Sequence, residues 1–150
     1  MNHADLAEQY FLSGYNCAQS VLLAFGDKTG LDESTAARLS SSFGGGLARM
    51  REVCGAVSGA AMVLGLLYGY DSPNAPDEKR AHYHRVQDFA ARFKEANGSV
   101  VCRELLSGVS VADGRDPEAR TAAYYQKRPC PQIIRQAAEI LDEMLEKLSG

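Results

Sequence analysis

The chain has 150 residues, of which 45% are hydrophobic and 23% are charged, and its formal net charge is −3. This composition is typical of a globular protein, and the length predicts a single domain over residues 1–150. The acidic balance and the lack of any basic run exclude an electrostatic case for nucleic acid or an anionic membrane as a partner.

The most hydrophobic stretch is the run from Val53 to Tyr70, which carries no charged residue. Its 18 residues reach the lower limit for a membrane span, but four glycines lower its hydrophobicity, so we expect the central helix of a bundle. Its small residues would also suit a homodimer. The N-terminal residues lack a cationic start followed by an apolar core, so no secretory signal is expected and the predicted location is cytoplasmic.

Apolar residues recur at helical spacing along most of the chain, which predicts an all-α fold. We expect a compact bundle of about five to seven helices around the central Gly/Ala-rich helix. The triplet Gly44-Gly45-Gly46 should end a helix, because each glycine costs about 1 kcal/mol inside one. Pro131 suits a first helical position, which makes Cys130 an N-cap. A helical pattern is found in residues 4–12, 17–25, 32–43, 53–70, 77–97, 100–106, 117–126 and 132–148. Of these segments, 100–106 is short and the pattern in 117–126 is weak.

All four cysteines fall in or beside the first turn of a predicted helix; they are Cys17, Cys54, Cys102 and Cys130. The unpaired N–H groups and the positive dipole end of a helix favour a thiolate there. Nearby cationic residues act in the same direction, namely Arg49, Arg51, Arg103, Lys127 and Arg128. The gaps of 37, 48 and 28 residues contain no CxxC, so a shared site must be assembled by the tertiary fold.

Glycines near Cys54 are candidates for contact with a bound group. Gly55 and Gly59 lie one turn apart and would let a cofactor, or simply another helix, approach the backbone closely. Gly45, within the glycine triplet, could form part of a backbone nest for an anion or a cluster, or part of a flexible connector.

With its four cysteines and the segment Cys54-Gly55-Ala56-Val57-Ser58-Gly59, the chain resembles the C_GCAxxG_C_C family of bacterial and archaeal proteins. Further matching segments are Gly14 to Gln19, Phe43 to Gly46 and Gly65 to Gly69. Val53 stands where the family label has a glycine, so CGAxxG is taken as the same motif. The resemblance implies that the four cysteines act together in a redox role, since redox activity is what the family is named for.

Two functions remain open at this point. In the first, the four cysteines form a redox site: thiols that cycle to disulfides, or ligands to an iron–sulfur cluster or another metal. Cys54 is then the first choice for the attacking thiol and Cys17 for its partner. The binding partner is an unidentified electron donor or acceptor, or a small molecule. In the second, the chain is a non-catalytic structural or metal-carrier module with a structural zinc or packed cysteines. Whether it is an oxidoreductase is thus undecided, while hydrolase motifs such as GxSxG and HExxH are absent.

Overall fold

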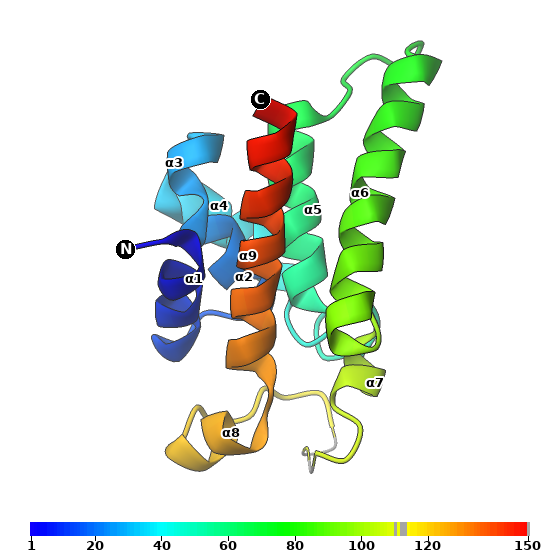
Figure 1. The fold of residues 1–150 in the computed structure, drawn as a ribbon. Coiled ribbons are helices and arrows are strands. Elements are labelled where there is room, and N and C mark those ends of the chain that lie inside the picture. Colours follow the sequence, from blue (N-terminus) through cyan, green and yellow to red (C-terminus); the bar gives the residue numbers. More distant parts are fainter. Residues whose placement is uncertain (110, 112–113, 150) are drawn as a thin grey trace.

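The computed structural model describes residues 1–109, 111 and 114–149. Within this part, nine α-helices and one short 3-10 turn are present and the β pairing is limited to one isolated bridge, which confirms the all-α class (Figure 1). The elements are α1 (His3–Leu12), α2 (Cys17–Ala24), α3 (Gly26–Thr29), α4 (Glu33–Ser40), η1 (Ser41–Phe43), α5 (Gly55–Tyr68), α6 (Pro76–Asn97), α7 (Cys102–Leu105), α8 (Ala122–Lys127) and α9 (Cys130–Ser149).

The helix count exceeds the expected five to seven because short segments form single turns of their own. Gly26–Thr29 was expected to be a break and is instead the four-residue helix α3. The weak segment 117–126 becomes helical only from Ala122, where the Thr121 hydroxyl caps the helix by accepting from the Tyr124 N–H at 3.2 Å.

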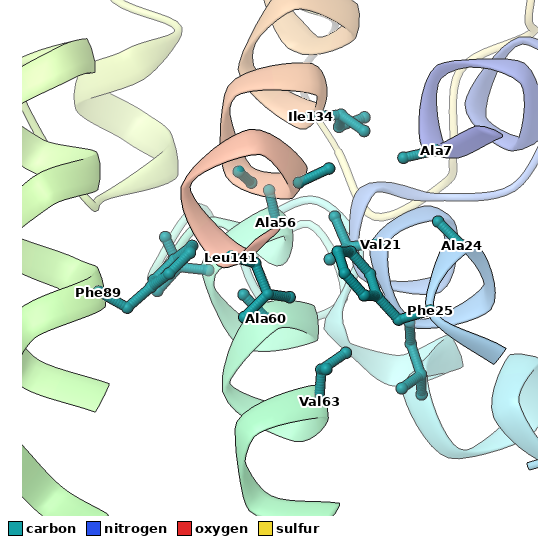
Figure 2. Packing of buried hydrophobic residues seen from close by; sticks show 14 of the residues in the cluster. Ala7, Val21, Ala24, Phe25, Ala56, Ala60, Val63, Phe89, Ile134 and Leu141 are labelled. Carbon is teal, nitrogen blue, oxygen red and sulfur yellow. The ribbon is translucent and has the colours of Figure 1, made fainter. Parts of the chain in front are cut away.

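The hydrophobic core lies where α5 and α9 meet the surrounding helices. Figure 2 shows small side chains of α5, such as Ala56 and Ala60, beside Leu141 of α9 and Phe89 of α6, all of them buried. Gly59 brings α5 close to α2, because a Cβ atom at this position would lie 2.7 Å from the Ala18 carbonyl oxygen. The central apolar segment is therefore a packed core helix, as its small residues predicted.

None of the helices is suited to span a membrane in the described residues. Among them, no helix combines the length and the hydrophobicity that crossing a bilayer would require.

One end of the bundle gathers the segments that carry the cysteines. The N-terminal ends of α5 and α9 lie at the end where α7 and α8 are also found (Figure 1). The isolated bridge between Val53 and Val101 fixes α7 to the start of α5. There the Cys54 N–H donates to the Val100 carbonyl at 2.8 Å, and the Cys102 N–H donates to the Glu52 carbonyl at 2.6 Å. This short pairing holds two cysteine-bearing backbones side by side.

The loop between η1 and α5 has an uncommon left-handed backbone. Five consecutive residues, 45–49, have φ between 46° and 70°, and Arg51 follows at 62°. Outside glycine this conformation costs about 1–2 kcal/mol per residue, so surrounding contacts must hold it in place. Two such contacts are the hydrogen bonds from the Ala48 N–H to the Ser42 carbonyl and from the Glu52 N–H to the Gly46 carbonyl, both 2.8 Å long. The glycine triplet therefore begins a defined, strained loop.

Candidate functional site

The four cysteines lie at the starts of four different helices, as their sequence positions predicted. Cys17, Cys102 and Cys130 are the first residues of α2, α7 and α9, and Cys54 is the N-cap of α5. Cys130 therefore lies one position inside its helix, whereas the sequence suggested a cap. The start of α2 is held by a capping box, in which the Asn16 side chain accepts from the Gln19 N–H at 2.9 Å.

All four cysteines line one cavity of about 50 Å³, which we call the thiol cavity. They are present as free thiols, and Cys54 and Cys102 are the more deeply buried two. Space for only a few water-sized groups remains between them. The other residues that line the cavity include three arginines, one tyrosine and two glycines of the strained loop: Arg51, Arg120, Arg128, Tyr124, Gly45 and Gly46.

Cys17 and Cys130 interact with each other within the cavity. The interaction between the two thiols lowers the pKa of Cys130 and, together with burial, raises the pKa of Cys17 well above its ordinary value. The interaction with Cys17 has a larger effect on the pKa of Cys130 than burial, which opposes it. The guanidinium of Arg128 lowers this pKa further, with smaller contributions from Arg120 and Arg51. The arrangement therefore favours the thiolate at Cys130 over a thiolate at Cys17.

Burial is the largest effect on the pKa of the other two cysteines. It raises the pKa of Cys54 to about 12, although the backbone N–H groups of Ala56 and Val57 favour the thiolate. It also raises the pKa of Cys102, although Arg51 donates a hydrogen bond to the Cys102 sulfur at 3.7 Å. The expectation that helix starts lower the pKa of all four thiols is therefore wrong for these two and for Cys17. Removal from water outweighs the helix dipole at buried positions.

The thiols supply donor chemistry for a metal, but their arrangement does not form an ion site. Four cysteines match the ligand sets of iron–sulfur clusters and tetrahedral zinc. In the described part of the chain, however, no group of three or more His, Cys, Asp or Glu residues is placed to hold a metal ion. Ligation by Cys17, Cys54, Cys102 and Cys130 therefore stays a prediction that would require the sulfurs to move.

The three glycines predicted to contact a bound group occupy different places. Gly55 and Gly45 line the thiol cavity, and a Cβ atom at Gly55 would lie 3.0 Å from the Cys17 Cβ. Gly59 does not line it, since its nearest neighbours are Ala18 and Val21 of α2. Close helix packing, one of the two explanations open from sequence, accounts for Gly59 fully.

The arginines at the site differ in part from those that sequence proximity indicated. Arg51 follows the sequence prediction only loosely, because the sulfur to which it donates a hydrogen bond is that of Cys102. Arg103, which follows Cys102 in the sequence, forms an ion pair with the exposed carboxylate of Glu52, with a nitrogen–oxygen distance of 3.7 Å. Arg120 was missed; it donates to the carbonyls of Phe11 at 3.1 Å and Tyr15 at 3.0 Å, which aims it at the start of α2. No local sequence signal connects it with a cysteine.

A compact set of helices that gathers four free cysteines around one small cavity defines a helical four-cysteine protein. The chain belongs to the C_GCAxxG_C_C family: the family's sequence profile, described as "Putative redox-active protein (C_GCAxxG_C_C)", matches residues 15–144. The matched region contains all four cysteines, so the resemblance drawn from the sequence is confirmed. Searches of curated proteins and of solved structures each returned no match.

Proposed function

We propose that this protein carries out thiol–disulfide exchange, with Cys130 as the attacking thiolate and Cys17 as the resolving thiol. The observation that carries the proposal is that Cys17, Cys130 and Arg128 line the same small cavity, where the two thiols interact and the thiolate at Cys130 is favoured. A thiolate is the nucleophile in disulfide exchange, and a second thiol within contact distance can release the mixed disulfide.

This assignment replaces the sequence-based choice of Cys54 as the attacking thiol. The raised pKa of Cys54 keeps it protonated near neutral pH, and a protonated thiol attacks disulfides poorly. The backbone pairing at Val53 and Val101 holds Cys54 and Cys102 close together. These two residues would line the cavity as uncharged thiols or form a second pair of thiols that can be oxidised.

The exchange is tested with four single cysteine-to-serine variants of protein purified without oxygen. Reduced wild type is oxidised with a small disulfide, and its cysteine linkages are mapped by peptide mass spectrometry. We expect a Cys17–Cys130 disulfide in the wild type, no reaction in Cys130→Ser, and a trapped mixed disulfide on Cys130 in Cys17→Ser. The matched controls Cys54→Ser and Cys102→Ser should retain exchange within about threefold, because neither is the nucleophile.

A second measurement addresses the thiolate directly. At pH 7, iodoacetamide should alkylate Cys130 about tenfold faster than Cys54 or Cys102. The proposal fails if Cys54 reacts first, or if the mapped disulfide joins other cysteines. Iron and acid-labile sulfide that all four serine variants lose alike would instead identify a cluster protein, and stoichiometric zinc would identify a structural module.

A further inference from the structure

A second cavity, of about 270 Å³, adjoins the thiol cavity, and we call it the arginine cavity. It contains none of the cysteines, and five of the protein's 16 lysines and arginines line it, although the chain as a whole is acidic. These five are Arg49, Arg51, Arg115, Arg120 and Arg128, and the only acidic residue among the described lining residues is Glu118.

Within the described part of the chain, three arginines of the cavity form no ion pair with a carboxylate, namely Arg51, Arg115 and Arg120. Glu118 lies 2.8 Å from Arg128 and 3.7 Å from Arg49, so one carboxylate serves two guanidinium groups. The hydrogen bonds of Arg120 to main-chain carbonyls orient this side chain without neutralising it. Arg115 is exposed at the cavity. The guanidiniums of Arg51, Arg115 and Arg120 therefore give the cavity a positive potential.

The two cavities share a wall, which places the arginines directly beside the thiols. The residues that line both are Asn16, Gly45, Arg51, Arg120, Tyr124 and Arg128. Arg128 is built into this wall: its side chain is 4% exposed, and its guanidinium lies 4.3 Å from the centre of the Tyr124 ring. A molecule whose anionic groups lie in the arginine cavity would thus have its neighbouring atoms at the thiol cavity.

We propose that the arginine cavity binds the carboxylates of a small dianionic disulfide and presents its S–S bond to Cys130. This inference rests on the proposed function. The Cys130 thiolate attacks one sulfur, forming a mixed disulfide and releasing the first half as a thiolate, which takes the proton of Cys17. The Cys17 sulfur then attacks the Cys130 sulfur and expels the second half as a thiolate. The substrate gains two electrons, and the protein ends with a Cys17–Cys130 disulfide.

The first test compares two disulfides of similar size, dithiodiglycolate with two carboxylates and bis(2-hydroxyethyl) disulfide with none. The measured quantity is the ratio of their rate constants with reduced protein, divided by the same ratio for free 2-mercaptoethanol. We expect a preference for the dianion of about tenfold, which added salt reduces. Arg115→Ala should lower this preference about threefold, whereas Arg80→Ala, which removes an exposed arginine on α6, should not change it.

The second test separates the binding site from the redox step. Adipate has the shape of dithiodiglycolate with two methylenes in place of the sulfurs, so it can bind but cannot exchange. We expect calorimetry to detect adipate binding to wild type and not 1,6-hexanediol binding, and Arg115→Ala should weaken the former. Exchange without charge preference and without adipate binding overturns this inference and leaves the proposed function standing. Adipate binding without exchange refutes the proposed function and supports the anion site.

Discussion

Gly46 offers a test of how tightly the strained loop is fitted against the thiol cavity. Its φ is +67°, and a Cβ atom there would lie 2.6 Å from the Glu52 nitrogen and 2.7 Å from the Cys102 Cβ. Gly30 provides a matched control, since its φ is +74° and a Cβ atom would meet nothing within 4 Å. Alanine at either position carries the same left-handed cost, so the difference between the two variants isolates the contact.

The left-handed conformation costs about 1–2 kcal/mol for a residue with a side chain. Gly30→Ala should therefore lower the free energy of unfolding by about that amount. Overpacking against backbone atoms adds about 1–3 kcal/mol, so Gly46→Ala should lose about 2–5 kcal/mol in total. Because the neighbouring atoms belong to the backbone and to the start of α7, a side-chain rotation cannot relieve the contact, and Cys102 must shift.

The measurement is equilibrium unfolding in urea of both reduced variants, followed by circular dichroism. Alkylation of Cys102 in the folded state should also become faster in Gly46→Ala and stay unchanged in Gly30→Ala. Equal losses of stability in the two variants, within about 0.5 kcal/mol, would refute the reasoning, because the contact would then add nothing to the backbone cost.

Two further predictions concern Cys54 and Asn16. Since the pKa of Cys54 is raised to about 12 from an ordinary value of 9.0, its stabilising effect is complete below pH 9 and is lost between pH 9 and 12. Between pH 9 and 12, the free energy of unfolding of wild type should thus fall by up to about 1.4 kcal/mol per pH unit more than that of Cys54→Ala. Parallel curves of stability against pH for the two proteins in this range would contradict this. Asn16→Ala removes the cap of α2 and a 3.1 Å hydrogen bond to the Ser41 carbonyl, so denaturant unfolding should reveal a loss of about 1–2 kcal/mol. The loss should exceed that of Asn2→Ala, where a single capping bond is removed.

Hydrophobic periodicity and caps were sufficient to predict most of the helices. Asn16, Asp32 and Pro76 mark the starts of α2, α4 and α6, and the central apolar run is helix α5. These signals are local, since a cap acts within one turn and a periodic face needs only its own segment. For the same reason, the position of each cysteine at a helix start could be predicted.

The pairing and ionisation of the cysteines could not be predicted in this way. Cys17 and Cys130 reach the same cavity through the docking of distant helices, and no spacing rule encodes their proximity. The raised pKa of Cys54 comes from burial by the folded chain, which the sequence alone does not reveal. The left-handed backbone at Leu47, Ala48 and Arg49 runs against the local preference of these residues, so only tertiary contacts explain it.

Cys17 and Cys130 are separated by 113 positions, and Cys130 is the first residue of α9. Contacts between segments this far apart form only when the chain reaches its complete topology, because a long loop must close first. Partial opening events that lift the start of α9 from α2 would separate these two sulfurs while much of the bundle stays folded. The reactivity of the two thiols therefore reports local opening of the native state. It should change at a lower concentration of denaturant than the helix content does.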